Sequence, residues 1–361
     1  MPPDTSVLKR PSTLASADAF VDQVEQRLAR LFQEERSRWE STYPQLRPGL
    51  AALESFVLGG GKRIRPRCVY WGNRAAGAEG NCADLVDVGA AIELFHAFAL
   101  VHDDVMDGSD QRRHQPTIHR QFATMHRAEQ WRGDERRVSE GFAILLGDLA
   151  FVYSTMLLRG APPRLHALFD EMRIELHVGQ YLDLSCAATG SAGDVVITDI
   201  ARFKTAKYTV ERPLHIGAAL AGRSDLDMCL SRFGMAVGEA FQLRDDLLGV
   251  FGSPDTTGKP AGDDLRDGKM TLLLQWAIGA ERPPAAALGR LGTDSLSEAD
   301  VAEITAFLIE SGAVARAERR IDRLVCDARD VLAHTRVAHG VQDDVIAGLC
   351  ELAETAAWRC T

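Results

Sequence analysis

The stretch "AAIELFHAFALVHDDVMD", residues 90–107, decides the fold of this chain and points to its chemistry. A strongly apolar run leads directly into three carboxylates, as expected of a buried helix whose end reaches a polar opening. On a helix, Asp103 and Asp107 share one face, and Asp104 lies about 100° round from Asp103. Like-charged neighbours at this spacing repel by roughly 3 kcal/mol per pair at an effective dielectric of ~20. These acids therefore need either full solvation or a compensating cation.

Three interpretations of the acidic segment are open at this point. It could be an exposed acidic helix end, or a salt-bridge cluster with Arg112 and Arg113. The apolar lead-in argues against the first, because it places the acids at the edge of a core. Hard oxygen ligands suit Mg²⁺, which shares its coordination shell readily with phosphates, and paired guanidiniums suit phosphate oxygens. The pattern favours the third interpretation, a metal–diphosphate site.

Composition excludes several classes of protein. The chain has 361 residues, 46% of them hydrophobic, and a formal net charge of −10 with dispersed Lys and Arg, which argues against nucleic acid as the main partner. Its seven cysteines are far apart and form no CxxC pair, so we expect reduced thiols and a cytoplasmic protein. No signal-peptide core opens the sequence, and no stretch reaches about 18 uncharged apolar residues, so we expect no membrane span.

Helical periodicity extends over almost the whole chain. "FVDQVEQRLARLFQEERSRW" (20–39) keeps its apolar residues on one face, and segments near the C-terminus do the same. Alternating strand-type patterns are scarce, and short Gly/Pro clusters separate the helical segments. We therefore predict a disordered leader over residues 1–17 and a single all-α domain over residues 18–361.

A second acidic pair lies about 140 residues after the first. Asp245 and Asp246 follow Gln242 by one turn, and the next segment carries further charged residues: Lys259, Asp263, Asp264, Arg266 and Lys269. In a helical bundle two Asp-rich helix ends can face each other across a cavity and hold several Mg²⁺ ions between them. Basic residues also gather beside the Gly-rich turn 59–61 and in the segment 203–213: Lys62, Arg63, Arg65, Lys204 and Lys207.

In their order and spacing these motifs resemble the trans-isoprenyl (polyprenyl) diphosphate synthases. The motifs are GGGKRIRP, His96 followed by DDVMD and RR, then KTA, FQLRDD and TGKPAGDDLRDGK. The resemblance covers roughly residues 20–350 and implies a single all-α bundle with a deep central cavity between two Asp-rich helices. It also implies a homodimer, about three Mg²⁺ per active site, and two substrates: isopentenyl diphosphate and an allylic diphosphate (dimethylallyl, geranyl or farnesyl).

Carried over position by position, the resemblance assigns roles to individual residues. The implied metal ligands are Asp103, Asp104, Asp107, Asp245 and Asp246. The residues implied to hold the allylic diphosphate are Arg112, Lys204 and Lys259, with Lys269 as a further substrate-binding residue. Those implied for isopentenyl diphosphate are Lys62, Arg65, His96 and Arg113, while Thr205 and Gln242 would line the carbocation path.

The sequence departs from the family pattern at one position of the second motif. Where the family usually has a third Asp, this chain has Gly249, in "DDLLG". The leading pair of carboxylates remains, and Asp263 or Asp264 is a candidate to compensate for the missing one. The departure concerns metal affinity more than the reaction.

The implied reaction is ionisation of the allylic diphosphate followed by coupling to isopentenyl diphosphate, and its product length depends on what blocks the cavity below Asp103. Phe98 lies five residues before Asp103, about 7.5 Å along the axis, and Ala99 lies one turn before it. In the family this pattern is typical of a twenty-carbon, geranylgeranyl diphosphate synthase, with Phe95 as a deeper block. A fifteen-carbon (farnesyl) synthase is the runner-up, and a class I terpene cyclase or a catalytically silent partner subunit is the alternative from another class.

Overall fold

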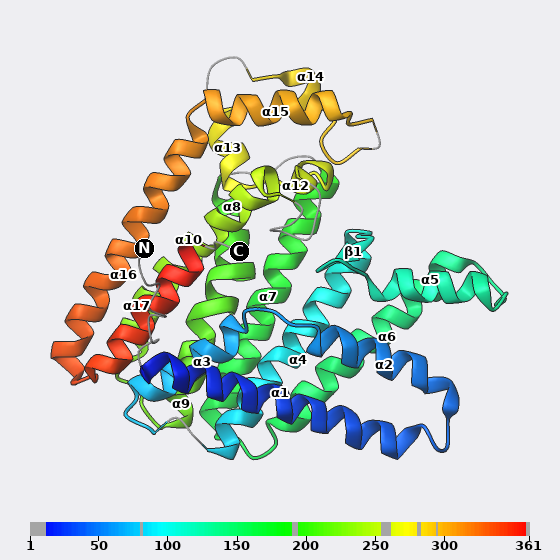
Figure 1. The fold of residues 1–361 in the computed structure, drawn as a ribbon. Helices are drawn as coiled ribbons and strands as arrows, with labels where there is room; N and C mark the ends of the chain where they lie inside the picture. Colours follow the sequence, from blue (N-terminus) through cyan, green and yellow to red (C-terminus); the bar gives the residue numbers. More distant parts are fainter. Residues whose placement is uncertain are drawn as a thin grey trace, which may run out of the picture.

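The structure, a computed structural model, describes residues 12–79, 82–189, 194–253, 261–279, 283–293 and 295–358 (Figure 1). The elements of the first half are α1 (Ser12–Trp39), η1 (Pro44–Leu46), α2 (Arg47–Leu58), α3 (Ile64–Ala75), α4 (Ala83–Met106), β1 (Gln111–Arg112), β2 (Gln115–Pro116), α5 (Ile118–Ala128), α6 (Glu135–Leu157) and α7 (Pro163–Thr189). Those of the second half are α8 (Asp194–Ala201), η2 (Arg202–Glu211), α9 (Arg212–Leu220), α10 (Asp227–Phe251), α12 (Asp263–Arg266), α13 (Leu272–Ile278), α14 (Ala285–Leu288), α15 (Glu298–Glu310), α16 (Ala313–His339) and α17 (Asp343–Ala357). The predicted all-α fold is confirmed.

The N-terminal helix begins before the expected end of the leader. α1 starts at Ser12, whereas the sequence predicted a leader reaching residue 17. Ala17 is buried, so the residues just before the predicted boundary already pack into the core. Residues 1–11 lie outside the described part of the chain, and the expectation of a disordered leader remains a prediction for them.

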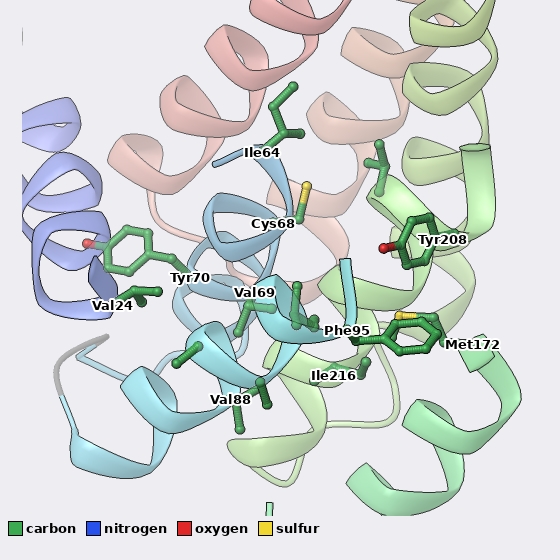
Figure 2. Close-up of a cluster of buried hydrophobic side chains, with 14 of the residues drawn as sticks. Val24, Ile64, Cys68, Val69, Tyr70, Val88, Phe95, Met172, Tyr208 and Ile216 are labelled. Carbon is green, nitrogen blue, oxygen red and sulfur yellow. The ribbon is translucent and has the colours of Figure 1, made fainter. Parts of the chain in front are cut away.

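α4 runs through the main core. It packs against α1, α3 and α6, and it is apolar on nearly all sides, as a helix surrounded by other helices must be. Phe95, on α4, is fully buried and meets Tyr208 of η2 with a ring-centroid distance of 5.8 Å (Figure 2). This burial fixes α4 in the bundle and delivers its acidic C-terminal end to the surface of the core.

A second core lies under the C-terminal half of α10. Leu247 and Val250 of α10 pack with Leu265 of α12 and with apolar residues of α13, α15 and α16. In Figure 1, α13, α14 and α15 gather at one end of the bundle, beyond the ends of α7 and α10. The packing of Leu265 brings the segment 261–269 back over the end of α10.

The segment with Lys204 and Thr205 is a π-helix between α8 and α9. Such wide turns occur often at functional sites, because the extra residue redirects the side chains around it. α10 approaches this segment closely: a Cβ added at Gly238 would lie 2.3 Å from the Cα of Ala206. Glycine at 238 therefore allows the contact between α10 and η2 on which the site depends.

Two of the described helices are long and apolar enough to pass a test for membrane spans by length and composition. They are α4, with 67% of its apolar window buried, and α6, with 33% buried. The burial of α4 is that of a core helix, whereas α6 presents apolar side chains to the outside. The absence of a membrane span remains a prediction.

Candidate active site

The three aspartates of the first motif come together at the end of α4. The N–H of Asp107 donates to the carbonyl of Asp103 at 2.8 Å and closes the last turn of the helix. Arg112 donates from Nε to Oδ1 of Asp104 at 2.8 Å, and its terminal nitrogen lies 3.5 Å from Oδ2 of Asp103. Asp104 is only 2% exposed, so its contact with Arg112 is shielded from water. Arg112 of the RR motif thus lies against the DDVMD motif.

A small hairpin separates the two arginines. β1 and β2 pair antiparallel, and the two turn residues, Arg113 and His114, have left-handed φ values of 52° and 61°. Arg112 ends β1 and reaches Asp104, whereas the left-handed turn at Arg113 directs its side chain elsewhere, and it donates to the carbonyl of Gly60. Adjacent in sequence, the two guanidiniums serve different parts of the site.

Lys204 joins the first motif from η2. Its Nζ lies 3.3 Å from Oδ1 of Asp103 and 2.7 Å from Oδ2 of Asp183, on α7. Gln180, one turn before Asp183, donates to the same Asp103 oxygen at 3.2 Å. Sequence reasoning missed Gln180 and Asp183; the available signal was a pair of polar residues three apart in α7.

Lys269 connects the two acidic regions. Its Nζ lies 3.7 Å from Oδ2 of Asp107, 3.5 Å from Oδ1 of Asp264 and 3.3 Å from Oδ2 of Asp267. Burial lowers the pKa of Lys269, but Asp264 and Asp107 outweigh it and raise that pKa above its usual value. We call Asp103, Asp104, Asp107, Arg112, Lys204 and Lys269 the carboxylate–cation cluster.

The second motif has one buried and one exposed carboxylate. Asp246 is 3% exposed and accepts a hydrogen bond from Nε2 of Gln242 at 2.6 Å, while Thr205 donates to the Gln242 carbonyl oxygen. Burial, and then the nearby Asp264 and Asp245 carboxylates, raise the pKa of Asp246 well above its usual value. Asp245 is exposed, so the two leading carboxylates occupy different environments.

The donor set fits Mg²⁺. Its side-chain candidates are carboxylates, the hard ligands that this ion prefers. Burial, and then the Asp103 carboxylate, raise the pKa of Asp107 to about 6, so an added cation would favour its ionised form. Burial also opposes ionisation of Asp103, but Lys204 and Arg112 lower its pKa below the usual value. Among the described residues no three acidic, His or Cys side chains form a closed metal cage, because lysines and Arg112 already hold the carboxylate oxygens.

The residues predicted for isopentenyl diphosphate form a separate basic region. Arg65 donates to Thr209 at 2.8 Å and lies over the Tyr208 ring, whose hydroxyl is 3.2 Å from Nδ1 of His96. Burial, then Arg65 and Arg113, hold the pKa of His96 well below its usual range. Lys62 lies in the loop between α2 and α3, directly after the Gly-rich turn 59–61. Positive potential is thus concentrated around a neutral imidazole.

Two basic residues of the predicted set need separate comment. Arg63, one of the basic residues beside the Gly-rich turn, donates to Glu93 at 2.6 Å and to the carbonyl of Val57 at 2.8 Å, both inside the core. The buried carboxylate on α4 thus has this guanidinium as its partner. Lys259 lies outside the described residues, and its role remains a prediction.

Below the acids, aromatic rings close around α4. Phe98 stacks on Phe95 at 5.5 Å and meets Phe151 of α6 edge-on at 5.2 Å, and Phe95 also meets Phe169 of α7 at 6.1 Å. We call Phe95, Phe98, Phe151 and Phe169 the aromatic cluster. The guanidinium of Arg173 lies 4.7 Å from the Phe151 ring centre and 4.6 Å from that of Phe169. Ala99, beside Phe98, is only partly buried.

A helical bundle that gathers carboxylates, lysines and arginines above an apolar floor defines a class of diphosphate-handling synthases. The family model described as Polyprenyl synthetase matches residues 50–308. A geranylfarnesyl diphosphate synthase of Aeropyrum pernix is 32% identical over 77% of this chain and 84% of its own length. A (2E,6E)-farnesyl diphosphate synthase of Mycobacterium bovis is 33% identical, covering 81% of this chain and 78% of its own.

A solved structure supports the same family assignment. A geranylgeranyl pyrophosphate synthase of Corynebacterium glutamicum, complexed with isoprenyl diphosphate and magnesium, superposes with a TM-score of 0.89 at 36% identity, covering 95% of this chain and 99% of that one. The chain belongs to the polyprenyl synthetase family. It is a short-chain trans-prenyl diphosphate synthase, a transferase, and this favours the synthase over the terpene cyclase and the silent subunit.

Proposed function

We propose that this enzyme condenses isopentenyl diphosphate with an allylic diphosphate and stops mainly at geranylgeranyl diphosphate. The observation that carries the product length is the pairing of a fixed ring at Phe98 with a small side chain at Ala99. Phe98 is held by Phe95 and Phe151, so it cannot swing aside to admit a longer chain. Ala99, one turn before Asp103, has only a methyl side chain, so it would not block the path below Asp103 as an aromatic side chain would.

The allylic diphosphate would bind at the carboxylate–cation cluster. Asp103, Asp107 and Asp246 are the carboxylates suited to hold Mg²⁺, together with Asp104 and Asp245, at about three ions per site. When bound, Mg²⁺ neutralises the charge of the leaving diphosphate and so favours cleavage of the allylic C–O bond. Arg112, Lys204 and Lys269 add fixed positive charge on the same side, already desolvated and oriented before the substrate arrives.

Isopentenyl diphosphate would bind without metal at the basic region of Lys62, Arg65, His96 and Arg113. His96, neutral because of its surroundings, can donate a hydrogen bond to a phosphate oxygen from one ring nitrogen while the other meets Tyr208. The double bond of isopentenyl diphosphate then attacks the allylic cation, and the new product loses a proton. Thr205 and Gln242 bind each other and are poor bases, so the departing diphosphate is the proton acceptor we propose.

A homodimer is the proposed assembly. Apolar side chains of α6 and α7 face outward, including Leu145 at 66% exposed, Ile174 at 64% and Tyr181 at 73%. A hydrogen bond of 2.9 Å from Arg173 to Thr155 joins the two helices, so these exposed apolar side chains lie on neighbouring elements. Exposed apolar side chains gathered in this way are typical of a protein interface. Leu145→Glu should dissociate the dimer in sedimentation experiments, whereas Val337→Glu, at an 85% exposed position on α16, should not.

The cytoplasmic location remains a proposal. It is supported by the described cysteines, which are all unpaired thiols: Cys68, Cys82, Cys186, Cys229, Cys326 and Cys350. Reduced thiols are typical of that compartment.

Incubation of the purified protein with Mg²⁺, isopentenyl diphosphate and each allylic primer in turn tests the proposed function. We expect twenty-carbon prenyl alcohols after dephosphorylation and chromatography. A fifteen-carbon product would establish the farnesyl alternative, which the 33% identity to the M. bovis enzyme keeps in view. A cyclic hydrocarbon from geranylgeranyl diphosphate alone would indicate the cyclase, and no turnover with any primer would contradict the proposal.

A further inference from the structure

The space beside Gly249 is filled by a carboxylate from another part of the chain. Gly249 follows Asp245 by four residues and Asp246 by three on α10, so a side chain there would share their face. A Cβ added at Gly249 would lie 1.9 Å from Oδ2 of Asp264, 2.5 Å from its Cγ and 3.2 Å from its Oδ1. Distances this short mean that Asp264 already occupies the position where a third aspartate of the motif would begin.

Packing holds Asp264 in this position. It is the second residue of α12, which begins after Gly262, and the carbonyl of Gly262 accepts from the N–H groups of Leu265 and Arg266 at 3.1 and 3.2 Å. Leu265 is 2% exposed and packs beneath α10, next to Leu247 and Val250. Because the neighbouring residue is buried in the second core, the Asp264 side chain is directed at α10 by the fold and not by chance.

The Asp264 carboxylate interacts electrostatically with both acidic regions. Its Oδ1 lies 3.5 Å from Nζ of Lys269, which also approaches Asp107 of the first motif at 3.7 Å. On the other side, its carboxylate contributes to the raised pKa of Asp246, after burial. The Asp264 side chain is 20% exposed, so it remains accessible from solvent.

From this geometry we infer that Asp264 supplies the third carboxylate of the second aspartate motif, and that Gly249 is required because it makes room for it. The inference rests on the proposed function, since it concerns the binding of Mg²⁺ and diphosphate at this site. It also decides between the two candidates left open by the sequence: Asp264, and not Asp263, replaces the missing Asp. The departure at position 249 is then an exchange of one carboxylate for another and not a loss.

A swap of the two residues tests the inference. The proteins are the wild type, Asp264→Ala, Gly249→Asp, and the double variant Gly249→Asp/Asp264→Ala. Binding of Mg²⁺ in the presence of inorganic diphosphate is measured by titration calorimetry, which needs no turnover. We expect Asp264→Ala to weaken Mg²⁺ binding about 10-fold or more. Gly249→Asp should lose at least as much, because two carboxylates cannot share one space. The double variant should recover to within about 3-fold of the wild type.

Matched controls separate this role from simpler ones. Asp267→Asn also removes a carboxylate from Lys269, whose Nζ lies 3.3 Å from Asp267, without touching Gly249. Asp263→Asn removes a neighbouring charge from the same turn. Both should bind Mg²⁺ within about 2-fold of the wild type. Asp264→Asn, which keeps the shape of the side chain, supplies the measurement if Asp264→Ala or Gly249→Asp does not fold.

Two results would overturn the inference. One is wild-type Mg²⁺ binding by folded Asp264→Asn; the other is an effect of Asp267→Asn as large as that of Asp264→Asn, which would reduce Asp264 to a partner of Lys269. Failure of the proposed function is distinguishable, because it appears as absent turnover in the wild type whatever the calorimetry gives.

Discussion

α4 contributes to two regions with opposite physics, although Asp103 and Phe98 lie only five residues apart. The carboxylate–cation cluster holds buried like charges together with lysines and arginines, and it is completed only by a charged ligand. The aromatic cluster is complete in itself, since ring packs on ring and Phe95 and Phe169 are fully buried. The first region should therefore govern rate and the second product length, and substitutions can test whether the two properties separate.

The largest effect is expected from Asp103→Asn. This change removes the charge that meets Lys204 and Gln180 and that we propose to hold Mg²⁺. We expect kcat/KM to fall by about 10³-fold or more, by analogy with the loss of other preorganised charges, with no change in product length. The measurement is steady-state kinetics with product chromatography.

Asp110→Asn is the matched control for this change. Asp110 lies just beyond the motif, is 71% exposed and pairs with Arg120. The kcat/KM of the Asp110→Asn variant should stay within about 2-fold of the wild-type value, because exposed ion pairs contribute little. A longer product from Asp103→Asn would show that the two regions are not separable.

Lys269→Gln should change how the protein responds to Mg²⁺. Without the ammonium, the carboxylates of Asp107, Asp264 and Asp267 repel one another, so the melting temperature without metal should fall by a few degrees. Mg²⁺ should then stabilise the variant more than the wild type. Thermal melting with and without Mg²⁺ measures both effects.

Lys207→Gln provides the comparison for Lys269. Lys207 also pairs with acids, Glu175 and Glu211, but away from the carboxylate–cation cluster. The Lys207→Gln variant should have a lower melting temperature than the wild type, but Mg²⁺ should not stabilise it more than it stabilises the wild type. An equal Mg²⁺ response in the two variants would remove Lys269 from the proposed site.

Phe98→Ala should lengthen the product by at least one five-carbon unit, while kcat/KM stays within about 10-fold of the wild type. The truncation opens space beside Phe95 and Phe151. Ala99→Phe should act in the opposite direction and favour fifteen carbons. Product chromatography reads both changes.

Leu94→Ala serves as the control for a buried truncation on α4. Leu94 is fully buried, so its loss should cost roughly 2–5 kcal/mol of stability and leave product length unchanged. If Phe98→Ala gives an unchanged length, the assignment of Phe98 as the block is wrong.

The smallest effect is expected at His96, which lies on α4 and meets Tyr208 of η2. Burial and then Arg65 lower its pKa in the folded protein, so the unfolded chain binds a proton that the folded one does not. Stability is therefore lost as pH falls below about 6.5, by on the order of 1.4 kcal/mol per pH unit at most. His96→Gln should remove this part of the pH dependence in urea unfolding. An identical pH dependence in both proteins would contradict the assigned surroundings.

The candidate site was predictable wherever its residues follow one another at helical spacing. Helical spacing predicted a shared site for Asp103, Asp104 and Asp107. It did the same for Gln242 and Asp246, which lie one turn apart. Gln180 and Asp183 share one face of α7, but neither they nor Phe151 showed which residues they would meet, because each contact depends on packing of α6 or α7 against α4 and η2. The partner of Arg63 was not predictable for the same reason, since Glu93 lies on another helix.

The sequence by itself determined the helices, the order of the motifs and the chemical type of the ligands, because periodicity and spacing along one helix are local properties. Only the tertiary structure decided which charges meet. It brought Lys269 between two acidic regions and placed Asp264 against Gly249, since both contacts require the chain to return over the end of α10 through the burial of Leu265. A glycine that looks like a defect in the second motif is, in three dimensions, the space that a carboxylate from α12 fills.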